Sequence, residues 1–233
     1  RYDAITFLPE DTVDGSTLTI ANPKSGGNSY PFIVKFNNEL KAEWIHALSD
    51  GGSSADYGQT YIDSYIEGNG DIVVIGQLGE QDRKILAEDT VDGNEIEMAR
   101  LGSENKRAVI IKYRNDGKVI WAKTPNAIMN NGNKESYTAL STGFHKIEKM
   151  NNGNYLVLAE KPYAFDDISK TINAEFTENN KVIKVKDSSN DSLLIQINQD
   201  GLITNAKIIK NCKIYNSMDG RSTQAFILGN SLY

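Results

Sequence analysis

The sequence is poor in the residues that commonly hold small or metal-dependent proteins together. Its one cysteine, Cys212, excludes an intrachain disulfide framework, and we expect it to be a small core residue. The two histidines, His46 and His145, leave few nitrogen ligands for a zinc site. Neither has an evident catalytic partner in the sequence. The 39% of hydrophobic residues in the 233-residue chain is an ordinary globular proportion.

Positive charge is also in short supply. The 25 Lys and Arg residues are outnumbered by 31 Asp and Glu residues, so the formal net charge is −6. A nucleic-acid binder normally needs a basic surface to neutralise phosphates, and a polybasic membrane-surface binder needs a similar excess. The sequence therefore argues against both kinds of partner.

Long apolar runs are missing as well. The longest aliphatic run, residues 72–75, has four residues, whereas a transmembrane helix needs roughly 20. We therefore expect no insertion into a membrane. Residues 1–9 also lack the basic start and apolar core of a signal peptide. Because the chain starts without Met, we expect a processed product or a fragment.

What the sequence does contain is an internal repeat of about 78 residues. The hexapeptide Glu-Asp-Thr-Val-Asp-Gly occurs at residues 10–15 and again at residues 88–93. Each copy is followed by a strand-like segment, a polar turn and a segment that ends in tryptophan, at Trp44 and Trp121. A third copy of the strand and turn follows, with Asn205 in place of the tryptophan.

The second half of the repeat also recurs, as two strand-like segments around a turn rich in Gly and Asn, at residues 61–76, 144–158 and 224–233. We expect one domain over residues 1–233, with units at approximately 1–78, 79–162 and 163–233. The chain starts and stops out of phase with the repeat. Three units would form an unusually small ring, and an open stack would expose strand edges. We therefore expect further repeats in the natural protein, or completion by copies of itself.

The local patterns predict an all-β fold with little or no helix. Alternating β-branched and aromatic residues mark short strands, separated by Asn-Gly and Asp-Gly turns. In each full unit we expect a four-stranded antiparallel sheet and an extra hairpin around the Asp-Gly turn. In the first unit the four strands are 32–36, 41–48, 58–66 and 71–77. Such sheets repeated in tandem are typical of a β-propeller-like array, because stacking covers faces that one sheet leaves exposed.

The order of these segments resembles the bacterial β-propeller repeat of secreted and cell-surface proteins, including the long repetitive surface proteins of low-GC bacteria. The resemblance is carried by Phe-Ile-Val-Lys-Phe at 32–36, Trp44, the glycines at 51–52 and Gly-Asn-Gly-Asp-Ile-Val-Val-Ile-Gly at 68–76. The chain departs from it at 124–126, where Thr-Pro-Asn replaces the glycine pair. The resemblance implies an extracellular scaffold or binding role and supplies no catalytic residues.

The candidate ligand-binding residues are few. Trp44 and Trp121 are either platforms on which a sugar stacks or, as their repeated placement favours, side chains packed between neighbouring blades. The remaining candidates either line a binding face or close a turn, and they are Asp56, Tyr57, Glu135 and Tyr137.

Evidence for catalysis or a cofactor is weak. The carboxylate pairs at 10–11, 88–89 and 166–167 are sequence neighbours, and neighbours on a strand point to opposite faces. They are therefore poor candidates for glycoside hydrolysis, which needs two facing carboxylates. Residues 187–191 and 198–201 offer oxygen ligands for calcium, but neither matches the twelve-residue calcium loop. We expect no cofactor, with calcium as the alternative.

From the sequence we therefore expect a non-enzymatic extracellular or cell-surface repeat module that acts as a binding or structural scaffold. Its ligand would be a glycan or a protein, and an acidic surface disfavours anionic partners. Two alternatives stay open. One is a structural repeat that associates edge to edge with itself into a larger surface assembly. The other is part of a propeller enzyme such as a glycoside hydrolase.

Overall fold

The computed structural model describes a set of segments that together contain every element discussed below: residues 5–20, 32–47, 49–50, 60–78, 83–98, 107–124, 126–130, 135–139, 144–159, 173–178, 181–186, 192–209, 227–228 and 231–232. Most of the described residues lie in β-strands, and the sheets that these strands form are antiparallel. The described residues contain only two helical segments, the short 3₁₀ turns Pro9–Asp11 and Ala87–Asp89. The predicted all-β class is confirmed.

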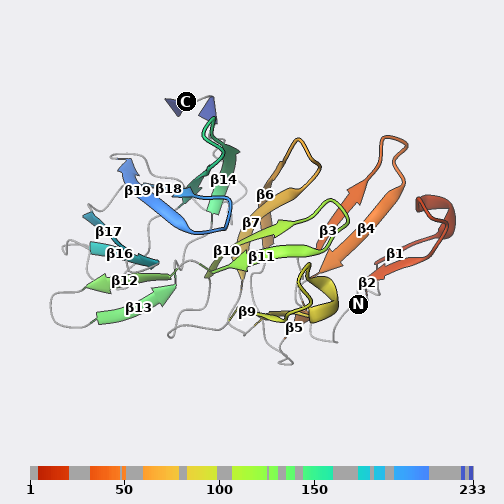
Figure 1. Ribbon diagram of the computed structural model, residues 1–233, viewed down its shortest axis with the longest axis horizontal. Helices are drawn as coiled ribbons and strands as arrows, with labels where there is room; N and C mark the ends of the chain where they lie inside the picture. Colours follow the sequence, from red (N-terminus) through yellow and green to blue (C-terminus); the bar gives the residue numbers. More distant parts are fainter. Residues whose placement is uncertain are drawn as a thin grey trace, which may run out of the picture.

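Three main sheets follow one another along the chain (Figure 1). Sheet I is a hairpin of β3 (Phe32–Phe36) and β4 (Ala42–Ala47). Sheet II has four strands, β6 (Thr60–Ile66), β7 (Ile72–Leu78), β10 (Arg107–Tyr113) and β11 (Val119–Lys123). Sheet III repeats this order with β14 (Phe144–Lys149), β15 (Tyr155–Ala159), β18 (Ser192–Ile197) and β19 (Ile203–Ile209).

The predicted strands exist, but their assignment to a single sheet was wrong. The strands expected at 58–66 and 71–77 form β6 and β7, which join β10 and β11 of the next unit instead of β3 and β4. The reason lies in the pairing of β7 with β10, which runs in register from Ile72 opposite Tyr113 to Leu78 opposite Arg107. Each strand contains a run of β-branched residues, 72–75 in β7 and 109–111 in β10, and these runs are buried on both faces. Each four-stranded sheet therefore combines the end of one unit with the start of the next.

Two further sheets are formed by the segments that connect these strands. β5 (Ser49–Asp50) pairs with β8 (Arg83–Ile85), which pairs with β9 (Ile96–Met98). The corresponding segment of the next unit forms a sheet of β12 (Asn126–Asn130), β13 (Glu135–Ala139), β16 (Asn173–Glu178) and β17 (Lys181–Lys186). Two further two-stranded sheets are described, made of β1 (Ile5–Phe7) with β2 (Leu18–Ile20) and β20 (Ile227–Leu228) with β21 (Ser231–Leu232).

The extra hairpin predicted around each Asp-Gly turn is confirmed, as β1–β2 and β8–β9. The connection in each is longer than a tight turn, because a 3₁₀ turn and a threonine precede the glycine. Thr12 forms a parallel bridge to Ala42, and Thr90 forms the same bridge to Val119. Each hairpin therefore covers the start of an outer strand, β4 or β11, and shields an edge that would otherwise be open to pairing.

The described sheets lie in a row and close into neither a barrel nor a propeller ring. β14 of sheet III packs against β6 and β7 of sheet II. One buried cluster lies between sheets I and II and a second lies between sheets II and III; the second includes Val73, Ile110, Phe144, Tyr155 and Ile195. In the part of the chain that is described, no helix has the length and apolar character to cross a membrane.

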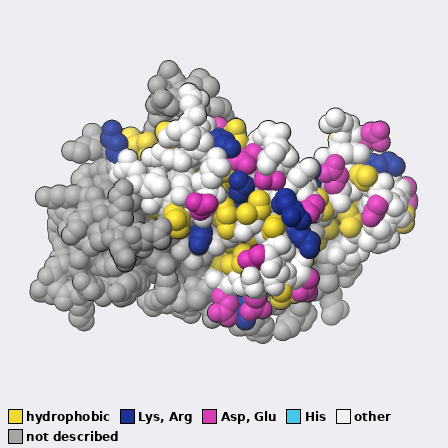
Figure 2. All heavy atoms as spheres, viewed as in Figure 1, with side chains coloured by type: hydrophobic (Ala, Val, Ile, Leu, Met, Phe, Trp, Pro, Cys, Tyr) yellow, Lys and Arg dark blue, Asp and Glu magenta, His cyan; other side chains and the backbone are white. Residues whose placement is uncertain are grey.

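Figure 2 shows one face of the molecule, on which acidic and basic side chains are interspersed over the described residues. Hydrophobic atoms are visible between them, including at the end where β1 to β4 lie. The tryptophan contacts that repeat from unit to unit lie where one main sheet meets the next. We call these places the first junction, between sheets I and II, and the second junction, between sheets II and III.

Candidate functional site at the sheet junctions

The side chains of four predicted site residues lie outside the described part of the chain. Asp56 and Tyr57 lie outside the described residues. Glu135 and Tyr137 belong to β13, where only the backbone is described, and Tyr137 is paired there with Ile128 of β12. Their proposed role in lining a binding face stays a prediction. The structure places the two tryptophans in detail.

Trp44 connects sheet I to sheet II. Its indole nitrogen donates a hydrogen bond of 2.8 Å to the backbone carbonyl of Asn115, in the turn between β10 and β11. The indole is 9% exposed and stacks on Tyr113, with ring centroids 5.8 Å apart. Because its faces are covered, a sugar could stack on Trp44 only if the first junction opened. The interpretation as a packing residue accounts for these contacts.

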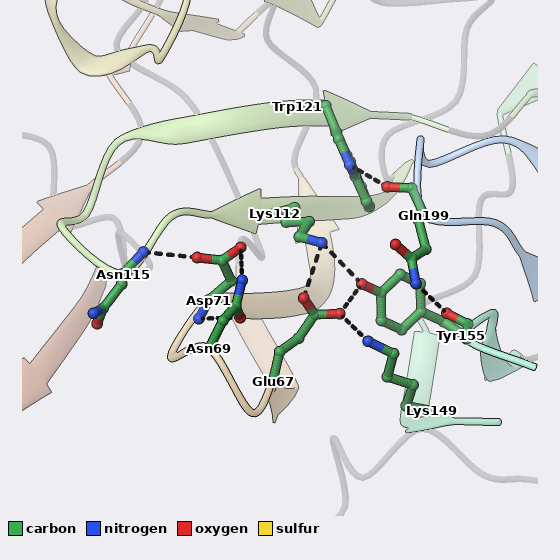
Figure 3. Close-up of polar contacts among 10 residues, drawn as sticks. Glu67, Asn69, Asp71, Lys112, Asn115, Trp121, Lys149, Tyr155 and Gln199 are labelled. Carbon is green, nitrogen blue, oxygen red and sulfur yellow. Dashed lines mark hydrogen bonds and ion pairs between the residues drawn. The ribbon is translucent and has the colours of Figure 1, made fainter. Parts of the chain in front are cut away.

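Trp121 repeats the contact at the second junction. Its indole nitrogen donates a 2.8 Å hydrogen bond to the carbonyl of Gln199, in the turn between β18 and β19 (Figure 3). The ring is partly buried and packs against the core between sheets II and III. Two tryptophans at equivalent positions thus make the same bond to equivalent turns, as packing between neighbouring sheets predicts.

Glycine is required where each indole meets its turn. Gly117 and Gly201 have positive φ angles of 88° and 80°, a region that side chains other than glycine disfavour. A Cβ atom on Gly117 would lie 2.7 Å from Cδ2 of Trp44, and one on Gly201 would lie 2.9 Å from Cε3 of Trp121. The Asp-Gly turns therefore serve both the hairpin and the packing of the preceding sheet.

Each of these turns is also hydrogen-bonded to the turn of the preceding hairpin in the same sheet. Asp71 accepts a hydrogen bond of 3.0 Å from the backbone N–H of Asn115 and one of 2.9 Å from the side chain of Asn69. In sheet III, Gln199 instead donates a 3.2 Å hydrogen bond to the carbonyl of Gly153. Each turn that receives an indole is thereby fixed by the hairpin beside it.

The second junction contains a buried ionic group that sequence reasoning missed. The Glu67 carboxylate, 8% exposed, is 3.0 Å from the Lys112 ammonium and 2.6 Å from that of Lys149. The hydroxyl of Tyr155 donates a 2.5 Å hydrogen bond to the same carboxylate (Figure 3). Glu67 and Lys112 come from sheet II, whereas Lys149 and Tyr155 come from sheet III. The group therefore links the two sheets electrostatically.

The protonation states of this group are strongly biased. Burial by itself raises the pKa of Glu67, but hydrogen bonds from Lys149, Tyr155 and Lys112 outweigh burial and lower the pKa to about 2. Burial and the Glu67 carboxylate both raise the pKa of Tyr155. Glu67 therefore stays ionised and Tyr155 stays neutral at physiological pH. Groups whose pKa values lie so far from neutral pH are poorly suited to proton transfer, for which a pKa near the working pH is best.

A second polar contact of interest lies at the first junction. Nδ1 of His46, on β4, is 3.2 Å from the hydroxyl of Tyr113, and Nε2 is 3.8 Å from the carboxylate of Asp89. Burial lowers the pKa of His46, and the Asp89 charge offsets this only in part. His46, which belongs to sheet I, is therefore neutral and contacts both sheet II and the hairpin that contains Asp89.

The calcium alternative finds no support in the described residues. The first candidate segment, residues 187–191, lies outside the described residues. In the turn at 198–201, the side-chain oxygen of Asn198 accepts hydrogen bonds from the backbone N–H groups of Asp200 and Leu202. Within the described part of the chain, no three His, Cys, Asp or Glu side chains gather as a metal site needs.

A pattern in the sequence could have revealed the ionic group. Lys112 is a charged residue inside an otherwise apolar strand, and it recurs as Lys35 in the first unit but as Gln196 in the third. Its partners come from segments 43 and 45 residues away, which no local motif connects. Comparison with known proteins adds no relationship: no protein-family model matches the chain, and no curated protein matches its sequence.

Proposed function

We propose that the chain is a non-enzymatic scaffold of propeller-like repeats that acts outside the cell and holds its loops for binding a glycan or a protein. The observation that carries this proposal is the tryptophan-to-turn contact made by Trp44 and again by Trp121. A contact repeated between successive sheets fixes their spacing, which is what a scaffold of stacked repeats requires. The extracellular setting rests on the resemblance to bacterial surface-protein repeats.

The chemistry of the second junction supports a structural role in preference to a catalytic one. Both oxygens of Glu67 are engaged by protein donors, and its low pKa keeps it from acting as an acid. A retaining or inverting glycosidase needs one carboxyl group that is protonated near neutral pH. The contacts of Glu67 therefore favour a structural role, in which its carboxylate links sheets II and III.

The test is a binding measurement on the purified chain. An array of bacterial and host glycans, followed by calorimetry with any glycan that binds, should give saturable binding without any change in the glycan. Tyr57→Ala and Tyr137→Ala should weaken this binding while leaving the melting temperature unchanged. Trp44→Ala should lower the melting temperature instead.

Three outcomes would count against the proposal. Release of a shorter sugar during the assay would favour the enzyme alternative. Binding that depends on Trp121 at unchanged stability would restore the stacking-platform interpretation. Absence of binding to every glycan and to surface proteins of the producing cells would reduce the role to that of a spacer.

A further inference from the structure

At the two outer sheets, the large and small residues of the tryptophan-to-turn contact exchange places. Sheet III has Asn205 where the other sheets have tryptophan, and sheet I has Leu40 where the other sheets have glycine. We propose that two copies of this chain associate head to tail, with sheet III of one copy packed on sheet I of the other and Asn205 facing the partner's Leu40. This inference builds on the proposed scaffold function and names its partner as a second copy.

Strand register shows that the positions are equivalent. Trp44 is paired with Lys35 in sheet I, and Trp121 is paired with Lys112 in sheet II. Asn205 is paired with Gln196 in sheet III, and in all three sheets the register shifts directly after this pair. Asn205 is exposed, and its side-chain oxygen accepts a hydrogen bond from the N–H of Ala206 on the same strand. Sheet III thus presents a short side chain where sheets I and II present an indole.

The receiving position changes in the opposite sense. Leu40 occupies the turn position of Gly117 and Gly201, with a positive φ of 62°, and it is the described residues' one non-glycine with positive φ. Its side chain is 80% exposed. At Gly117 even a single added Cβ atom would meet the incoming indole at 2.7 Å. Leu40 therefore has no room for a tryptophan, but it fits a shorter residue such as asparagine.

Sheet I also exposes apolar residues at positions that are covered elsewhere. Phe36 is 46% exposed, whereas the equivalent residues Tyr113 and Ile197 are fully buried. Phe32 is 43% exposed, whereas its equivalents in sheets II and III, Val109 and Leu193, are 0% and 3% exposed. Tyr113 is covered by Trp44 and His46 of the preceding sheet. In the described part of the chain, Phe7 of β1 meets the Phe36 ring edge-on, with ring centroids 5.7 Å apart, and Phe36 still remains 46% exposed. Sheet I therefore keeps apolar surface suited to the kind of cover that Tyr113 receives.

The edge of β3 is open in the same way. β10 pairs with β7 and β18 pairs with β15, but β3 pairs only with β4 among the described strands. By sequence, residues 224–233 are the third version of the hairpin that supplies β7 and β15. Within the described part of the chain, β20 and β21 pair only with each other. A head-to-tail contact brings this hairpin of one copy to the free edge of β3 in the other, where it can add strands.

One molecule cannot make this contact with itself in the arrangement described. Sheets I and III lie on opposite sides of sheet II (Figure 1). A head-to-tail interface uses two different surfaces, so it produces either a closed ring of copies or an open filament. The association should therefore extend beyond a dimer as concentration rises, unless a small ring closes.

The experiment is sedimentation velocity of the chain over a hundredfold range of concentration. Leu40→Gly removes the larger partner and Asn205→Trp enlarges the smaller one, so each variant should weaken association about tenfold. The double variant recreates the indole-glycine pair found at the two junctions, and it should restore association to within about threefold of the parent. Both positions are exposed, and circular dichroism would confirm that each variant is folded.

Phe36→Lys should abolish association, because it places a charge in the proposed interface. Ile66→Lys is the matched control, since Ile66 is a 66% exposed apolar residue of sheet II, and it should leave association unchanged. A parent chain that stays monomeric throughout, or single and double variants whose effects simply add, would overturn the proposal. Glycan binding measured on the monomeric Phe36→Lys variant reports on the scaffold function separately.

Discussion

The indole of Trp44 lies against Gly117, a residue of the next sheet, so closely that the glycine has no space for a side chain. The two residues are 73 positions apart in the sequence, and the contact exists only because β3–β4 and β10–β11 belong to neighbouring sheets. The same arrangement joins Trp121 to Gly201. Stability should therefore be unusually sensitive to small changes at these glycines.

Gly117→Ala should lower the free energy of unfolding by about 3 kcal/mol, as the sum of backbone strain at positive φ and overpacking against the indole. Urea denaturation at neutral pH measures this change. Gly15→Ala is the control, because Gly15 also has a positive φ, 72°, but nothing lies within 4 Å of an added Cβ atom. It should cost only about 1 kcal/mol. Equal losses for the two variants would contradict the packing argument.

Trp44→Ala should destabilise the protein by about 3–5 kcal/mol, because it leaves a cavity in the core of the first junction. Trp44→Phe retains most of the packing and loses the bond to Asn115, so it should cost about 1–2 kcal/mol. Trp121→Ala should cost less than Trp44→Ala, since Trp121 is only partly buried. Thermal unfolding of the three variants ranks these effects, and a stable Trp44→Ala protein would contradict the packing interpretation.

Acid should loosen the second junction through Glu67. Its pKa is about 2 in the folded protein and near 4.5 when unfolded, so the unfolded state binds a proton more readily. The stability due to this group is complete above about pH 4.5 and is lost as the pH falls towards 2. Stability measured by chemical denaturation at several pH values between these limits should show the loss.

Glu67→Gln should remove that part of the pH dependence. It should also cost about 3 kcal/mol at neutral pH, because Lys112 is then buried without its counter-charge. Glu97→Gln is the control, since Glu97 forms an exposed ion pair with Lys84, and exposed pairs contribute about 0–1 kcal/mol. An unchanged acid profile in Glu67→Gln would show that other carboxylates dominate acid unfolding.

Mild acid should act on the first junction through His46. Because burial lowers its pKa below the ordinary value of 6.5, the unfolded state gains a proton first and stability falls as the pH drops below 6.5. Nuclear magnetic resonance titration should show the His46 ring still neutral when an exposed histidine is half protonated. His46→Gln keeps a hydrogen-bonding group near Tyr113 and should flatten the decline below pH 6.5. A His46 pKa above 6.5 would refute this account.

Local strand positions could be read from the sequence almost to the residue. The strand expected at 41–48 is β4, Ala42–Ala47, and the one expected at 71–77 is β7, Ile72–Leu78. Alternation and Asn-Gly or Asp-Gly turns determine where a strand starts and stops, because these are properties of neighbouring residues. The equivalence of Trp44 and Trp121 followed from the repeat for the same reason.

Which strands share a sheet could not be read in this way. β7 continues into a hairpin and then pairs with β10, across a separation of about 35 residues. The patterns on β3 and β10 are similar, so the sequence alone does not distinguish them as neighbours of β7. The burial of both faces of β7 and β10 decided the outcome, and burial depends on every surrounding sheet.

The ionic group around Glu67 likewise separates what the sequence determines from what the tertiary structure determines. The sequence determined the repeat, the β-strands, the turns and the residue types at each position. Only the tertiary structure brought Glu67, Lys112, Lys149 and Tyr155 together and gave the carboxylate its low pKa. Local conformation depends on neighbours in the chain, whereas burial and charge pairing depend on the distances that the packed sheets impose.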